Sequence, residues 1–162
     1  MRLFYLSSYN MKNLAFILMA FCLFCGISVH AQLKDETKWT FEAKKISGDK
    51  YQLIVHCKLP KSWHIYALEP GGDGSMIAPV ITFKPTKNVK YIGKVTEKGK
   101  RISMAMEGVP GKVNYFENSV DYVQEAEIKG GATVNGTYSY QICTDQMCLP
   151  PTDDKPFTIK VK

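Results

Sequence analysis

The chain has 162 residues, enough for a targeting segment and one domain with a core of ordinary size, and too few for two such domains. Its 21 lysine and arginine residues outnumber the 15 aspartate and glutamate residues, which gives a formal net charge of +6. The lysines are scattered and no arginine cluster occurs, which argues against a nucleic-acid-binding surface.

The first 31 residues have the features of a secretory signal peptide. A lysine precedes the apolar run 14–27, and the small-residue site Val29-His30-Ala31 predicts cleavage after Ala31. Met11 already begins a complete signal, so residues 1–10 are interpreted as a start-site extension. The apolar run is too short for a membrane anchor. We therefore expect a periplasmic protein that has no stable membrane insertion after cleavage.

Residues 32–162 are predicted to form one all-β domain. Apolar and polar residues alternate with a period of two, as at Trp39, Phe41 and Ala43, and no window has a helical stripe. The turn at Gly48-Asp49 predicts a hairpin between the first two strands. Strands are expected at residues 39–43, 51–59, 63–66, 79–83, 89–95, 101–107, 120–128, 133–143 and 157–161. About nine short strands are typical of an antiparallel β-sandwich.

Cys57 shares its predicted strand face with Leu53 and Val55, so we interpret it as a small buried residue. The alternative is an immunoglobulin-type bridge between Cys57 and Cys143. That bridge requires Cys143 to point inward, and it lacks the tyrosine expected two residues before the second cysteine, where Gln141 stands.

Met104 and Met106 fall on one face of a predicted strand. Together with Met76, Met147 and the histidines they raise the alternative of a copper(I) carrier, because thioethers and imidazoles are soft ligands. Two core methionines are the simpler interpretation. We therefore predict no metal site and no cofactor.

Cys143 and Cys148 are separated only by the segment 144–147. If this segment is the turn of a hairpin, the two cysteines become cross-strand neighbours with Cβ atoms about 4.5–5.5 Å apart, within reach of a disulfide. So small a ring gives a bridge worth about 2 kcal/mol at best. The alternation places Cys143 opposite Ile142, on a polar face, so the bridge is predicted to be exposed and labile.

A tyrosine and a glutamine precede the first cysteine of this segment, and two prolines follow the second. The segment resembles the active-site segment of the N-terminal periplasmic domain of the DsbD family of thiol:disulfide interchange proteins. There a Tyr-Gln-x-Cys…Cys-x-Pro-Pro run carries the redox pair. The matching residues are Tyr140, Gln141, Cys143, Cys148, Pro150 and Pro151. The cysteines are one residue closer together than in the family pattern, so the tip of the loop is expected to differ. The resemblance implies an immunoglobulin-like fold and thiol–disulfide exchange.

The resemblance also implies what surrounds the redox pair. It places His64 and Tyr66 beside the cysteines, where an imidazole can stabilise a thiolate; by pattern alone they form a polar, solvated face. Asp145, inside the loop, is expected to line the site together with Tyr140 and Gln141. The segment that holds Tyr115 and Phe116 is predicted to be a loop or a frayed strand. The resemblance makes one of these two rings a cap over the disulfide, and core packing is the alternative.

These observations predict a protein that relays reducing equivalents from a thioredoxin-like donor to periplasmic clients. By resemblance, Cys148 forms the interprotein disulfide and Cys143 resolves it. The family's membrane electron conductor and thioredoxin-like part are expected on separate chains. The alternative is a non-catalytic immunoglobulin-like binding or scaffold module with a structural disulfide.

Overall fold

The structure is a computed structural model that describes residues 34–162. The predicted signal peptide, residues 1–31, lies outside the described residues, so its cleavage remains a prediction. Across residues 34–162 there are eleven strands and no helix that could span a membrane. The strands are β1 (Lys38–Ser47), β2 (Lys50–Lys58), β3 (His64–Gly71), β4 (Val80–Phe83), β5 (Val89–Lys98), β6 (Arg101–Ala105), β7 (Lys112–Glu117), β8 (Ser119–Ile128), β9 (Ala132–Ser139), β10 (Ile142–Cys143) and β11 (Lys155–Val161).

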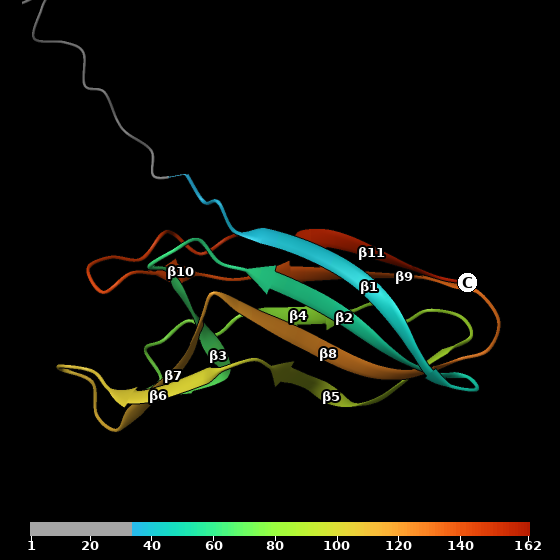
Figure 1. Cartoon of the computed structure of the whole chain (residues 1–162), viewed down its shortest axis with the longest axis horizontal. Coiled ribbons are helices and arrows are strands. Elements are labelled where there is room, and N and C mark those ends of the chain that lie inside the picture. Colours follow the sequence, from blue (N-terminus) through green and yellow to red (C-terminus); the bar gives the residue numbers. More distant parts are fainter. Residues whose placement is uncertain (1–33) are drawn as a thin grey trace, which may run out of the picture. The chain divides into compact units, whose positions relative to one another are not determined.

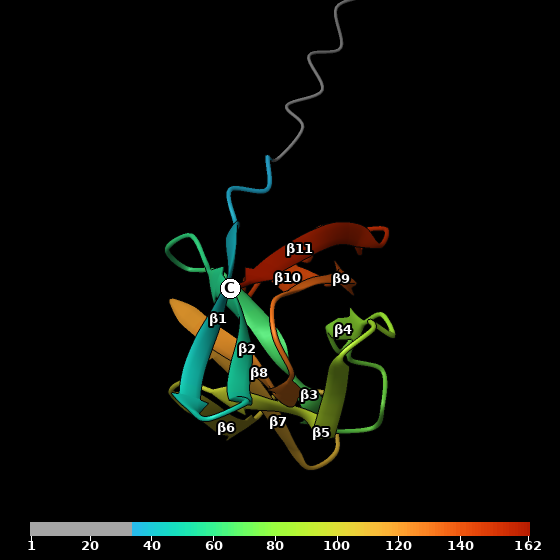
Figure 2. The same ribbon diagram turned by 90° about the vertical axis from the view of Figure 1, so that its right-hand side faces the viewer.

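The strand pairs are antiparallel and form three sheets. Their orders are β1-β2-β8-β5, β10-β3-β7-β6 and β11-β9-β4. Figures 1 and 2 show β1, β2 and β8 opposite β9 and β11, with β3, β6 and β7 grouped toward one end in Figure 1. This arrangement confirms the predicted antiparallel all-β sandwich, with eleven strands in place of about nine.

The main core lies between the β1-β2-β8-β5 and β11-β9-β4 sheets. Phe41 of β1 stacks on Phe157 of β11 with ring centroids 5.0 Å apart, and Trp39 lies 4.5 Å from Tyr138 of β9. Fully burying one large apolar side chain is worth roughly 1.5–3 kcal/mol, so this cluster is the main source of stability. The predicted β1–β2 hairpin is confirmed, and its turn uses Gly48 at a φ of 50°.

The β10-β3-β7-β6 sheet is apolar on both faces. Along β3, Ile65 and Ala67 are fully buried in the main core, whereas Tyr66 points to the opposite face. There Tyr66 packs in a second, smaller cluster with Tyr115 and Cys143. Successive side chains of a strand point to opposite faces, so one sheet separates the two clusters. The second cluster carries the candidate functional site.

The strand predicted over residues 133–143 is two strands. β9 ends at Ser139 in one sheet, and β10 begins at Ile142 in another. Between them the Tyr140 N–H donates to Thr152 Oγ1 at 3.0 Å, and the Tyr140 carbonyl accepts from the Thr152 N–H at 2.9 Å. The continuous strand was therefore a wrong prediction, because the alternating pattern does not reveal which segment pairs with Tyr140.

The segment predicted as a loop or a frayed strand is β7, an interior strand paired with β3 on one side and β6 on the other. Pro110 and Gly111 precede its first residue, Lys112, and so do not interrupt the ladder. The overlooked signal was the alternation of Val113 and Tyr115, which are both buried on the same face.

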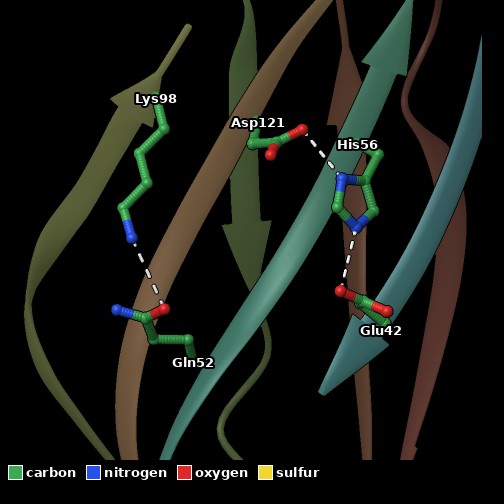
Figure 3. A network of polar contacts seen from close by, with 5 residues as sticks. All are labelled: Glu42, Gln52, His56, Lys98 and Asp121. Carbon is green, nitrogen blue, oxygen red and sulfur yellow. Dashed lines mark hydrogen bonds and ion pairs between the residues drawn. The ribbon is translucent and has the colours of Figure 1, made fainter. Parts of the chain in front are cut away.

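A polar network lies on the surface formed by β1, β2 and β8 (Figure 3). His56 Nδ1 is 2.7 Å from Asp121 Oδ1, and its Nε2 is 3.3 Å from Glu42 Oε1. Partial burial disfavours the imidazolium, but the hydrogen bonds and charges of the two carboxylates outweigh it and raise the pKa of His56 above its ordinary value. Beside it, Lys98 Nζ donates to the uncharged amide of Gln52 at 3.4 Å.

The raised pKa of His56 predicts a pH-dependent contribution to stability. The contribution is complete below the unfolded-state pKa, near 6.5, and is lost as the pH rises through the folded-state pKa. We expect His56→Gln to lower the free energy of unfolding by up to about 1 kcal/mol at about pH 5.5 and by less at about pH 8.5, since these groups are partly solvated. Urea unfolding at the two pH values measures this.

Lys98→Ala is the matched control, since it removes a contact to a neutral amide on the same surface. Its effect should be the same at both pH values. A His56→Gln effect that does not change with pH would contradict the ion-pair interpretation.

Candidate functional site

A disulfide joins Cys143 and Cys148, whose Cα atoms are 3.9 Å apart. The two residues also form an isolated antiparallel bridge. Cys57 is a free thiol, buried in the main core as its strand face predicts. Burial raises the pKa of this thiol strongly, which makes it a poor nucleophile. The alternative bridge from Cys57 to Cys143 is therefore absent.

The predicted hairpin is present, and its turn is held by hydrogen bonds. The Thr144 N–H donates to the Met147 carbonyl at 2.7 Å, and Thr144 Oγ1 accepts from the N–H groups of Gln146 and Met147, each at 3.2 Å. Past the disulfide, the Leu149 N–H donates to the Ile142 carbonyl at 3.0 Å. A hydroxyl at position 144 thus closes the tight turn that brings the two cysteines together.

Tyr140 and Gln141 position the hairpin and do not line the site. The Tyr140 ring lies in the main core, 4.8 Å from Trp39, and its hydroxyl donates to Asp35 Oδ2 at 2.5 Å. Gln141 Nε2 donates to the Leu149 carbonyl at 2.8 Å. Partial burial would raise the pKa of Asp35, but the bonds it accepts outweigh burial and lower that pKa. The charged carboxylate thus ties the hairpin to the chain before β1.

The two cysteines of the bridge differ in exposure. Cys143 is 1% exposed and belongs to the second cluster, whereas Cys148 is exposed. Cys143 does lie opposite Ile142, as predicted, but the expectation that its face is polar and solvated is wrong. The face is covered because Met76, after β3, and Val109, after β6, pack over the cluster. Of the two bonded cysteines, only Cys148 is exposed to solvent.

A pocket of about 430 Å³ opens beside the disulfide and brings together residues that are distant in sequence. Four predicted site residues line it: His64, Tyr66, Tyr115 and Asp145. They come from β3, β7 and the tip of the hairpin. Three methionines, at positions 76, 104 and 106, complete the apolar wall.

His64 is the cross-strand partner of Cys143. Directly opposed residues of an antiparallel pair have Cβ atoms about 4.5–5.5 Å apart on the same face, so the imidazole adjoins the buried sulfur. The ring is 6% exposed and lies 4.8 Å from the Tyr115 ring. Burial lowers the pKa of His64 despite the opposing charges of Asp145 and Glu117. A neutral imidazole of this kind can accept a proton from a neighbouring thiol.

Only Tyr115 of the two predicted cap residues stands near the bridge. Its ring packs in the second cluster with Cys143, and its hydroxyl donates to Met104 Sδ at 3.0 Å. Phe116 points the other way, into the main core, and is 1% exposed. The alternation of β7 separates the two side chains, so a cap role for Phe116 has no geometric basis.

The methionines of the pocket were assigned to the wrong environment. Met104 was predicted in the core, but 47% of its surface is exposed. Met106 is partly buried against the second cluster, not the main core. The spacing of Ile102, Met104 and Met106 correctly placed them on one face; what the pattern could not reveal is that this face belongs to a pocket wall.

A sequence model of the family described as "Thiol:disulfide interchange protein DsbD, N-terminal" matches residues 30–158. No match was found among curated proteins. Among solved structures, the N-terminal periplasmic domain of ScsB from Proteus mirabilis is 13% identical with a TM-score of 0.50, over 83% of this chain and 49% of that chain. This chain thus spans about half of that one, and the likeness shows the fold.

Two further structures are more distant in shape. The DsbD n-terminal domain of Neisseria meningitidis in the reduced form is 16% identical with a TM-score of 0.41, over 75% of this chain and 84% of that chain. The yeast GGA1_GAE domain-P21 structure is 10% identical with a TM-score of 0.41, over 82% of this chain and 96% of that chain.

The family match includes the whole disulfide hairpin and every strand that lines the pocket. The disulfide and the antiparallel strands agree with the fold and the cysteine pair that the sequence resemblance implied. The chain belongs to the family of the N-terminal domain of the thiol:disulfide interchange protein DsbD.

Proposed function

We propose that this chain is a periplasmic protein that relays reducing equivalents through Cys143 and Cys148, from a thioredoxin-like donor to periplasmic clients. The observation that carries the proposal is the asymmetry of the bridge. Cys148 is exposed, and Cys143 is buried opposite a neutral imidazole. A purely structural disulfide requires neither feature.

The exchange proceeds through two mixed disulfides. A donor thiolate attacks Cys148 Sγ, the Cys143–Cys148 bond breaks, and Cys143 leaves with the electron pair and takes up a proton. The donor's second thiol then displaces Cys148, which leaves the donor oxidised and this chain as a dithiol. In the second half, Cys148 attacks a client disulfide. Cys143 resolves that bond and releases the client as a dithiol, so two electrons are transferred in all.

His64 is the proton acceptor in this scheme. It faces Cys143 across the β3–β10 pair, and Cys143 must lose its thiol proton before it can resolve the mixed disulfide. A buried thiol resists ionisation, so a neutral base beside it lowers the cost of forming the thiolate.

The partners follow from the same chemistry. The predicted signal peptide supports export, and an oxidising compartment allows the bridge to form. We propose that the thioredoxin-like donor and the membrane electron conductor are separate chains. The competing function, a binding or scaffold module, differs in the reduction potential of the pair. A potential below about −300 mV would favour that module, because such bridges resist the thiol pools that they meet.

The unequal exposure of the two cysteines predicts that their alanine variants accumulate different amounts of mixed disulfide. Cys143→Ala should accumulate a mixed disulfide through Cys148 with a thioredoxin-like protein, because nothing resolves it. Cys148→Ala should not, since Cys143 is buried. Incubation with a periplasmic extract and non-reducing electrophoresis measures the adducts. Cys57→Ala is the control and should trap nothing, and equal trapping by the first two variants would refute the assigned roles.

The proton-acceptor role predicts a change in the pH profile. In the wild type, the rate at which Cys143 resolves a mixed disulfide should fall as His64 becomes protonated, with an inflection below about pH 6.5. His64→Gln should slow resolution at least about tenfold and remove this inflection. Stopped-flow kinetics from a preformed adduct provides the profile. A slower rate with an unchanged inflection would show that His64 is only structural.

Replacing Tyr115 and replacing Phe116 should have opposite effects on the reduction rate and on stability. Tyr115→Ala should uncover Cys143 and speed reduction of the bridge by dithiothreitol, whereas Tyr115→Phe, which keeps the ring, should not. Phe116→Ala should instead cost about 3–5 kcal/mol of stability, since it empties part of the main core, without faster reduction. Should Tyr115→Ala leave the reduction rate unchanged, the ring is not a cap.

A further inference from the structure

The methionines of the described residues lie near the disulfide hairpin. Residues 34–162 contain Met76, Met104, Met106 and Met147, and the first three line the pocket. They come from separate parts of the chain: Met76 follows β3, Met104 lies in β6, and Met106 follows β6. Met104 is 47% exposed at the wall of the pocket, where a core-packing role gives no reason for a thioether. Sequence spacing alone does not produce this convergence.

A buried nitrogen lacks a partner in the same pocket. His64 lines the pocket and is 6% exposed, and its Nε2 is buried with no hydrogen-bond partner. Buried polar atoms are nearly always hydrogen-bonded, and an unpartnered one costs about 1–3 kcal/mol. An unprotonated imidazole carries one nitrogen lone pair that can bind a metal ion.

The donor set selects a particular kind of ion. Among residues 34–162 no group of three histidine, cysteine, aspartate or glutamate side chains could hold a metal ion, which leaves no ordinary site for zinc or for a hard cation. Thioether sulfur and imidazole nitrogen are soft donors that favour copper(I). Asp145 and Glu107 also line the pocket and supply negative charge that suits a monovalent cation.

We propose that this pocket binds a soft monovalent cation of the copper(I) class through His64 and the sulfurs of Met76, Met104 and Met106. The site shares His64 with the proposed exchange chemistry, but it needs neither cysteine as a ligand, because the sulfurs of the closed disulfide are not thiolates. It is therefore present in the oxidised protein, where ion binding can be measured without electron relay.

Silver(I) is the probe, since it matches copper(I) in charge and softness and does not change valence beside a disulfide. The protein carries Cys57→Ala, which removes the free thiol, and is kept oxidised. Calorimetric titration should show one silver ion bound per chain. Met104→Leu/Met106→Leu should weaken the affinity at least about tenfold, which corresponds to 1.4 kcal/mol. Exchange of Met for Leu conserves volume and preserves folding.

Met147→Leu is the matched control, because this methionine lies on the hairpin tip and does not line the pocket. Its affinity should stay within about twofold of the parent value. Nitrogen-15 NMR should show the largest change at the His64 ring. The proposal is overturned if the oxidised protein shows no saturable binding, if the double variant and Met147→Leu bind equally, or if binding appears only after the disulfide is reduced.

Discussion

The organisation of this domain depends on how the chain passes from β9 to β10. Within two residues it leaves the β11-β9-β4 sheet and joins the β10-β3-β7-β6 sheet. Tyr140 fixes the passage, because its backbone pairs with Thr152, its ring packs against Trp39 and its hydroxyl bonds Asp35. The anchor determines which way the next two side chains point. Ile142 packs in the main core, and Cys143 packs in the second cluster on the other face.

Burial on that other face gives the site its chemistry. An apolar wall excludes water from His64 and keeps the ring neutral, although acidic residues lie nearby. The same wall buries one cysteine of the disulfide and leaves the other exposed. Packing thus makes the two cysteines unequal, as the proposed division of roles requires. The hairpin needs no helix dipole to make its two cysteines unequal.

Much of this arrangement can be predicted from the sequence, because it depends on the alternation of apolar and polar residues within single strands. The parity of Cys143 against Ile142, the core position of Cys57 and the β1–β2 hairpin are period-two features that the structure confirms. Whether loops cover a face of a sheet does not depend on the local sequence of its strands. Part of the pocket wall comes from the connections after β3 and β6, and a strand pattern does not indicate which loops fold over a face.

The incorrect predictions of site residues have the same cause, since they were also based on local sequence. Tyr140 and Gln141 were expected to line the site because they adjoin the cysteines, yet one packs in the core and the other braces the hairpin. Phe116 was expected near the bridge because it follows Tyr115, although adjacent residues of a strand face opposite ways. In both cases sequence proximity was a poor guide to spatial proximity. The resemblance to a known family identified the segment but not the side of the sheet that each residue occupies.

The buried thiol of Cys57 affects how the native disulfide forms during folding. Removal of the predicted signal peptide would leave three of the five cysteines. An unfolded chain can form three different disulfides from these, and two of them would involve Cys57. Closing a short loop costs less entropy than closing a long one, so Cys143 and Cys148 meet far more often than either meets Cys57. Folding then seals Cys57 among apolar side chains, beyond the reach of oxidants. The native pairing is thus favoured by chain statistics before folding and protected by the core afterwards, so this chain should reach its oxidised state without a disulfide isomerase.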